Sequence, residues 1–131
     1  QNVEEYFSYL RNKYPNKVRI ETKDINAEKL KSVPKALHSL YNEMSKAILP
    51  YGEIFSIEEA LEQSKRNPFK PKWFVFGKDR YFTFWLCSYE EDAEGLSFTY
   101  WDHESGNEIE EAVWKDVISF LQEIEEENRE F

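Results

Sequence analysis

The chain has 131 residues, a length that fits one domain with a real core but is short for two. Charged residues make up 33% of it, the net charge is -9, and the 17% aromatic content excludes an intrinsically disordered chain. Its apolar stretches are far shorter than the roughly 20 residues of a membrane-spanning helix. Gln1 to Glu5 also lack the basic-then-apolar layout of a secretion signal. We therefore expect a soluble, cytoplasmic protein without membrane contact.

The first third of the chain predicts two helices separated by a short strand. Apolar residues at helical spacing indicate a helix from about Val3 to Tyr14, and alternation indicates a strand from Lys17 to Glu21. A weakly helical stretch from Asp24 to Lys31 follows. Ser32 and Pro34 then begin a helix whose apolar stripe is formed by Leu37, Leu40, Tyr41 and Met44. His38 lies beside that stripe, where we expect it to be structural or exposed.

The middle of the chain predicts a small β-unit followed by a helix. Ala47 to Leu49 and Glu53 to Phe55 are apolar runs on either side of a Pro-Tyr-Gly turn. Ser56 stands three residues before Glu59, which is the spacing of a helix-capping box. We therefore expect a helix from there to about Lys65.

The richest signal is a β-hairpin that follows the two prolines of the loop 67–72. Trp73 to Phe76 and Tyr81 to Leu86 are aromatic and β-branched runs typical of strands. Gly77 to Arg80 between them supplies the turn. The single cysteine, Cys87, excludes an intramolecular disulfide, and a strand thiol is most often an inert small apolar residue.

The last third predicts one more strand and a closing helix. Leu96 to Trp101 alternates between two faces, and Asp102 to Asn107 turns the chain. The helix is indicated by Val113, Val117, Leu121 and Ile124, widened by Trp114, Ile118 and Phe120. We expect Glu125 to Phe131 to fray. The order of elements predicts an α+β fold, a single domain over residues 1–131 with a mainly antiparallel sheet flanked by helices.

Charge is unevenly distributed along the chain. Basic residues dominate Lys65 to Lys72, while acidic clusters occur at Glu90 to Glu94 and in the tail from Glu123 to Glu130. Direct nucleic-acid binding is disfavoured, because such domains carry a basic face that neutralises phosphates. An acidic surface suits a basic partner instead. The alternative is that these charges are an ordinary solvated surface that keeps the protein soluble.

Catalytic and metal-binding patterns have little support in the residues. The chain has two histidines, His38 and His103, no HExxH helix, no paired-cysteine motif and no acidic calcium loop. It lacks a Gly-x-Ser-x-Gly elbow, and its four glycines are too scattered for a phosphate loop. Asp102-His103-Glu104 is the one suspicious cluster, and a turn held by local hydrogen bonds is the favoured interpretation. We expect no catalytic residue, metal or cofactor, and a hydrolase using Asp102 or Glu104 is the remaining enzymatic alternative.

Several segments in the right order resemble the SUKH superfamily. They lie between Val33 and Ile124: Val33-Pro34, Leu40-Tyr41-Asn42, Ile54 to Glu59, Trp73 to Gly77, Tyr100 to Glu104 and Ser119-Phe120-Leu121. That group contains the yeast cell-wall assembly regulators and many bacterial proteins regarded as immunity proteins against secreted toxins. The resemblance implies a SUKH-like fold and a non-catalytic, protein-binding function.

The resemblance also implies a partner: a cognate toxin domain, such as a basic nuclease or another toxin that acts on nucleic acid. Candidate aromatic anchors are Tyr81, Trp85 and Trp101, with Phe82, Phe84 and Leu86 assigned to the core. Candidate rim charges are Glu90, Glu91, Asp92, Glu94, Asp102 and Glu104. Two alternatives remain open: the aromatics pack under a helix, or the protein is a regulatory adaptor related to the cell-wall regulators. The oligomeric state is not determined.

Overall fold

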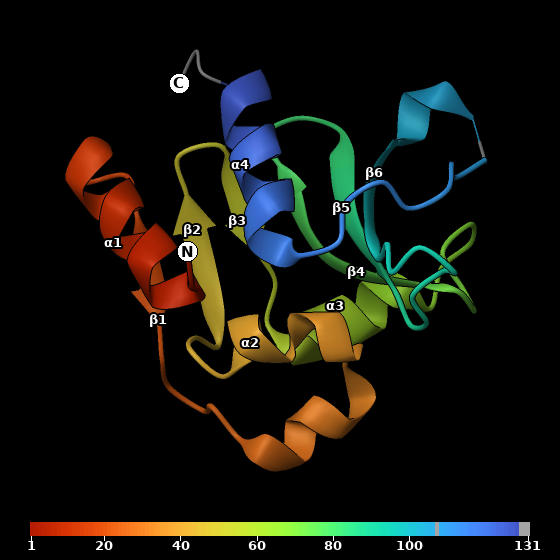
Figure 1. Ribbon diagram of the computed structural model, residues 1–131, viewed down its shortest axis with the longest axis horizontal. Helices are drawn as coiled ribbons and strands as arrows, with labels where there is room; N and C mark the ends of the chain where they lie inside the picture. The colour runs from red at the N-terminus through yellow and green to blue at the C-terminus, as the bar shows by residue number, and fades with distance from the viewer. Residues whose placement is uncertain (107, 129–131) are drawn as a thin grey trace.

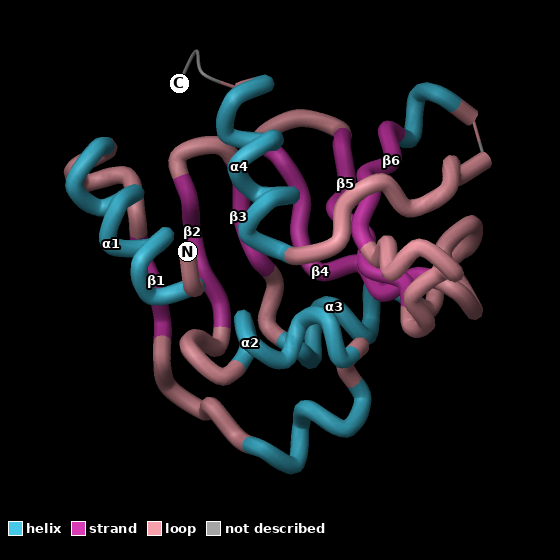
Figure 2. Tube along the Cα trace, viewed as in Figure 1, coloured by secondary structure: helices cyan, strands magenta, loops and turns pink. Residues whose placement is uncertain are grey.

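A computed structural model, which describes residues 1–106 and 108–128, contains one antiparallel sheet in which each strand pairs with the next strand along the chain. The strands are β1 (Arg19–Glu21), β2 (Lys46–Leu49), β3 (Gly52–Ile54), β4 (Trp73–Asp79), β5 (Thr83–Ser88) and β6 (Phe98–Asp102). Figure 2 shows them as a continuous magenta layer. The α+β fold class is confirmed, and all the strands belong to this sheet in the order β1 to β6.

Within the described residues, four α-helices and three short 3₁₀-helices surround the sheet. They are α1 (Val3–Lys13), α2 (His38–Tyr41), α3 (Ile57–Ser64), α4 (Val117–Glu127), η1 (Ala27–Ser32), η2 (Lys35–Leu37) and η3 (His103–Ser105). Figure 1 shows α1 and α4 side by side in front of the strands, and the Gln122 amide of α4 donates to the Gln1 amide oxygen (2.8 Å). No helix in the described part of the chain is long and apolar enough to cross a membrane.

The core is an aromatic cluster between α4 and the sheet. Phe120 of α4 contacts the rings of Phe76, Phe98 and Trp85, with centroids 5.9 to 6.4 Å apart. Burying each such side chain contributes about 2 kcal/mol. The opposite face of the sheet is also covered, because Phe69 from the loop after α3 packs on Phe84 (5.7 Å). Both faces of β5 are therefore buried near its middle.

The hairpin forms, but its turn lies later than the sequence predicts. Gly77 is inside β4, next to a β-bulge, and the turn falls after Asp79. A Cβ at Gly77 would lie 2.4 Å from the Trp85 ring and 2.5 Å from the Glu53 carbonyl oxygen. The glycine is thus needed for the close packing of Trp85 rather than for a turn. Phe82, which we assigned to the core, lies at the turn and is 51% exposed.

The closing helix differs from its expected bounds at both ends. It begins at Val117, where the Asp116 carboxylate accepts a hydrogen bond from the Ser119 N–H (2.9 Å). Trp114 instead forms a β-bridge with Phe98, and Val113 is exposed. The prediction that the chain frays from Glu125 is wrong as far as Glu127, and residues 129–131 lie outside the described residues, as does Asn107 of the expected turn.

Smaller differences concern the first half of the chain. The helix expected from Asp24 is the 3₁₀-helix η1, which Asn26 caps through the Glu28 N–H (2.9 Å). The second helix is split into η2 and α2, and Met44 is buried although it lies beyond them. The helix after Ser56 is confirmed as α3, since the Ser56 hydroxyl accepts from the Glu59 N–H.

Candidate functional site

Apart from Trp85 and Trp101, the residues proposed as partner-binding lie at opposite ends of the sheet. β5 and β6 pair antiparallel, with Thr83 opposite Asp102 at one end and Cys87 opposite Phe98 at the other. We call residues 79–83 with 102–104 the aromatic end, and residues 88–96 with Glu111 the acidic end. Figure 1 shows the β5–β6 loop of the acidic end at the lower right and η3, which belongs in part to the aromatic end, at the upper right. Tyr81 and Glu90 therefore do not belong to one contiguous site.

The loop of the acidic end is held in shape by its own hydrogen bonds. The Asp92 carboxylate accepts from the backbone N–H groups of Glu94 and Leu96, each at 2.9 Å. Gly95 adopts a φ of 80°, a conformation that favours glycine, and its N–H donates to the Asp92 carbonyl (3.0 Å). The Ser88 hydroxyl donates to the Glu90 carbonyl. Glu90 and Glu91 are thus presented on a preorganised turn.

A hollow of about 520 Å³ opens beside this loop. Carboxylates line it from two segments far apart in sequence, namely Glu90, Glu91, Asp92 and Glu111. Its apolar lining comes from Pro71, Tyr89, Leu96 and Ala112. The Tyr89 side chain is 42% exposed, and its ring packs edge-on against Phe74 with centroids 6.0 Å apart. The hollow combines an apolar lining with a strongly negative rim.

A larger groove of about 1100 Å³ lies on the other side of the same loop. It runs between the starts of α1, η2 and α4, and it shares Ser88, Tyr89, Glu90 and Glu91 with the hollow. Its charges are mixed, because Lys35 and Lys115 also line it. Residues 88–91 therefore line both concave surfaces.

The aromatic end presents two exposed rings on a rigid turn. The carboxylate of Asp79 accepts hydrogen bonds from the N–H groups of Tyr81 (2.8 Å) and Thr83 (3.1 Å). Tyr81 is 66% exposed, and the ring of Phe82 contacts that of His103 edge-on at 5.1 Å. The hollow and the larger groove at the acidic end do not include this tip.

Two of the proposed anchors are core residues. Trp85 is fully buried beneath α4, so its side chain offers no surface to a partner, and its indole N–H has no hydrogen-bond partner among the described residues. Trp101 is buried against Phe69 (5.3 Å), and its indole N–H donates to the Gly106 carbonyl (3.0 Å). The alternative that these aromatics pack under a helix describes Trp85, which contacts Phe120 of α4, whereas Trp101 packs against Phe69 of the loop after α3. The alternation of residues along β5 and β6 could not reveal that both tryptophans are buried, because both faces of the sheet are covered.

The suspicious polar cluster is a local turn. The Asp102 carboxylate accepts from the Glu104 N–H (2.9 Å) and begins η3, as the interpretation of local hydrogen bonding predicts.

His38 is half-buried with a ring nitrogen 2.9 Å from the Val33 carbonyl oxygen. Burial raises the pKa of the Cys87 thiol, so this side chain is not a thiolate at neutral pH. In residues 1–106 and 108–128 no three His, Cys, Asp or Glu side chains are grouped so as to hold a metal ion.

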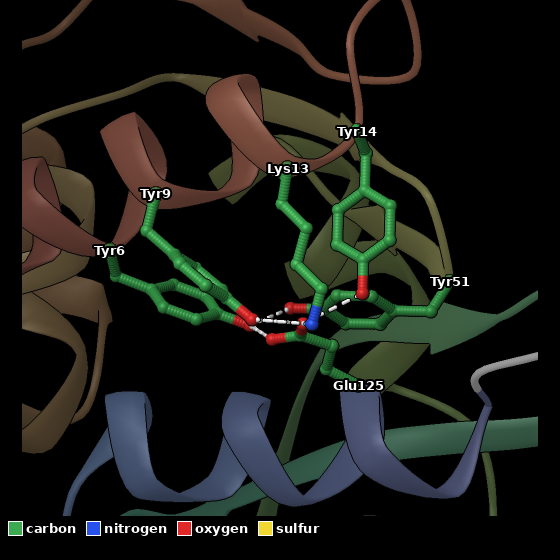
Figure 3. A network of polar contacts seen from close by, with 6 residues as sticks. All are labelled: Tyr6, Tyr9, Lys13, Tyr14, Tyr51 and Glu125. Atoms are coloured by element: carbon green, nitrogen blue, oxygen red, sulfur yellow. Dashed lines mark hydrogen bonds and ion pairs between the residues drawn. The ribbon is translucent and has the colours of Figure 1, made fainter.

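The most elaborate polar network surrounds Glu125 of α4 (Figure 3). Its carboxylate accepts hydrogen bonds from the phenols of Tyr6 (3.1 Å), Tyr9 (2.6 Å) and Tyr14 (2.8 Å), and the Lys13 ammonium lies 3.6 Å away. The hydroxyl of Tyr51, in the β2–β3 turn, is 2.8 Å from that of Tyr6. We call these six residues the Glu125 network. Its contacts connect α1, α4 and the β2–β3 turn, which indicates a structural role.

The phenols of this network stay protonated because of their surroundings. Burial is the main cause that raises the pKa of Tyr6, and the neighbouring Tyr51 and Glu125 raise it further. Burial and the hydrogen bond to Glu125 also raise the pKa of Tyr9 and Tyr14. Each phenol can therefore act as a donor to the carboxylate.

Sequence reasoning missed Tyr89, Leu96 and Glu111 at the acidic end. Tyr89 directly precedes the acidic run, so its position was the available signal. Glu111 joins the hollow through the irregular segment before α4, and nothing in the local sequence indicates that.

No protein-family model matches the chain, and comparisons with curated proteins and with solved structures find no match either. The function of the acidic end is therefore inferred from its own chemistry and from the resemblance of the sequence.

Proposed function

We propose that this chain is a non-catalytic protein-binding domain, an immunity protein of the SUKH type that neutralises a cognate basic toxin domain in the cytoplasm. The resemblance over Val33 to Ile124 supports the family, and the α+β fold is compatible with it. Fold alone does not define function, so the proposal depends on the surface.

The observation that carries the proposal is the acidic end. Four carboxylates surround a hollow with an exposed tyrosine, on a chain whose net charge is -9. A negative surface raises the association rate of a positively charged partner through long-range attraction. A toxin that acts on nucleic acid carries a basic cleft. An acidic protein bound in that cleft would block the nucleic-acid substrate from it.

Titration calorimetry against the toxin domain encoded beside the gene, with a parallel assay of toxin activity, tests the proposal. Binding with inhibition is the expected result. If the neighbouring gene encodes no toxin, or if the pair neither binds nor inhibits at micromolar concentrations, the immunity function is wrong and a regulatory adaptor becomes the better account.

A further inference from the structure

We propose that the Glu125 network is a site of one-electron oxidation, at which Tyr9 gives an electron to a small oxidant at the surface and its phenolic proton to the Glu125 carboxylate. This activity goes beyond the proposed binding function and does not depend on it. It follows from the contacts between phenols and carboxylate, from the exposure of one ring of the network and from an aromatic path that joins the network to the core.

The carboxylate of Glu125 is placed to accept a proton from a tyrosine. A phenol gives up an electron more readily when its proton leaves at the same time, so a base within hydrogen-bond distance determines which tyrosine is oxidised. The Tyr9 phenol donates to Glu125 Oε2 over 2.6 Å, the shortest of the three phenol–carboxylate distances. Figure 3 shows the phenols converging on this carboxylate. An ionised carboxylate is an acceptor only, so it can take up the proton that the phenol already shares with it.

The electron and the proton leave Tyr9 for different acceptors. The oxidant takes one electron from the ring, the phenolic O–H bond breaks, and a new O–H bond forms on the Glu125 carboxylate. The products are a neutral phenoxyl radical, a carboxylic acid and the oxidant reduced by one electron. The Lys13 ammonium, 3.0 Å from the Tyr9 oxygen, remains as a hydrogen-bond donor to the radical.

Tyr9 connects the network with the solvent. Its side chain is 38% exposed, whereas Tyr6 and Tyr51 are completely buried. The rings of Tyr9 and Tyr6 are stacked, with centroids 5.8 Å apart. A small oxidant can therefore contact Tyr9 directly, and the buried phenols exchange electrons with it through the stacked ring.

The second, independent observation is Trp85 in the core. Among the described residues its indole N–H is the buried side-chain donor without a hydrogen-bond partner, so an oxidised indole would hold a charge in apolar surroundings with no group to take its proton. Its ring lies 5.8 Å from that of Tyr51, whose hydroxyl is 2.8 Å from the Tyr6 hydroxyl. An electron from Tyr6, passed through Tyr51, restores the indole while the Tyr6 proton moves to Glu125, 3.1 Å away. The network is thus oxidised in place of the core.

The test is photo-oxidation of the whole chain with tris(bipyridine)ruthenium(II) and persulfate in the presence of a biotinylated phenol that couples to tyrosyl radicals. Mass spectrometry then maps the labelled tyrosines. Tyr81 is the internal control, because it is 66% exposed and, in the ranges that the structure describes, no carboxylate is bonded to its phenol. We expect about tenfold more label on Tyr9 than on Tyr81 in the folded chain and equal label on both in urea. Equal or greater label on Tyr81 in the folded chain would overturn the proposal, because exposure alone would then determine oxidation.

Two variants test the role of the proton acceptor. Glu125→Gln keeps the shape of the side chain and still accepts hydrogen bonds, but its amide does not take the proton, so label at Tyr9 should fall about tenfold. Glu123→Gln, on the same helix and outside the network, should leave it unchanged. Circular dichroism checks that both variants are folded, and the comparison of Tyr9 with Tyr81 in the parent needs no variant. Equal label at Tyr9 in the two folded variants would contradict the inference.

The path from the core has a separate readout, the addition of oxygen to Trp85 in the same peptide maps. Tyr6→Phe interrupts the path and keeps Tyr9 with its acceptor, so it should raise oxidation of Trp85 about fivefold above the parent. Equal oxidation of Trp85 in both chains would overturn the path. No toxin is present in these experiments, so their failure leaves the immunity function standing, and failure of that function leaves the oxidation site standing.

Discussion

Glu125 and the acidic end carry the same functional group in opposite surroundings. The Glu125 side chain is buried and accepts hydrogen bonds from three tyrosines, so its bonding capacity is used inside the protein. Glu90 and Glu111 border a hollow and, among the described residues, have no ion-pair partner. The first carboxylate stabilises the fold, whereas the other two make no ion pair among the described residues and face the hollow.

Removal of Glu125 should give the largest effect on stability. Glu125→Ala leaves three phenols without their acceptor and should lower the free energy of unfolding by about 3 kcal/mol. Urea denaturation followed by circular dichroism measures it, with Glu123→Ala on the same helix as the control. If the two variants are equally stable, the structural role of the Glu125 network is refuted.

Tyr6→Phe should have a smaller effect of about 1.5 kcal/mol, because it removes one hydroxyl that contacts both Glu125 and Tyr51. Tyr81→Phe at the exposed hairpin tip is the matched control and should change stability by less than about 0.5 kcal/mol. A loss of similar size in both variants would show that the buried hydroxyl contributes nothing specific.

Alkaline pH should weaken the Glu125 network. The pKa of Tyr6 is raised in the folded chain above its ordinary value of about 10, so the native state keeps a proton that the unfolded state loses. The resulting stability is fully present below pH 10 and falls as pH rises, by up to about 1.4 kcal/mol per pH unit for each such phenol. Urea denaturation between about pH 8 and about pH 11 should show this fall, and Tyr6→Phe should make it shallower. An identical slope in the variant would contradict the assignment.

Neutralising the acidic end should have the smallest effect on stability. Glu90→Gln, Glu91→Gln and Glu111→Gln together should keep the free energy of unfolding within about 0.5 kcal/mol of the parent, because these side chains make no ion pair among the described residues. The same denaturation experiment checks this. A loss of several kcal/mol, as expected for Glu125, would mean that these carboxylates serve the fold instead of a partner.

Local signals predicted much of the fold. The capping spacing of Ser56 predicted α3, and the aromatic runs predicted β4 and β5. The spacing of apolar residues predicted α1. These features depend on residues close together in sequence, which is why they could be read directly.

Features that depend on distant contacts could not be predicted. Glu125 belongs to an acidic tail that resembles a solvated helix end, but the phenols of Tyr9 and Tyr14 that donate hydrogen bonds to it lie in and just after α1, more than 100 residues earlier. Gly77 resembled a turn residue because the Trp85 ring that requires it is contributed by the next strand. The charges in the sequence predicted the acidic loop. They could not predict the hollow, because Glu111 lines it from a segment distant in sequence.

Recognition of a basic toxin by the acidic end is measured by the association rate at low salt, followed by stopped-flow fluorescence. Glu90→Lys, Glu91→Lys and Asp92→Lys together should slow association about tenfold relative to the parent. Glu28→Lys, Glu43→Lys and Glu62→Lys, which make the same change in net charge outside the hollow and the groove, should slow it far less. Equal rates for the two triple variants would contradict the account.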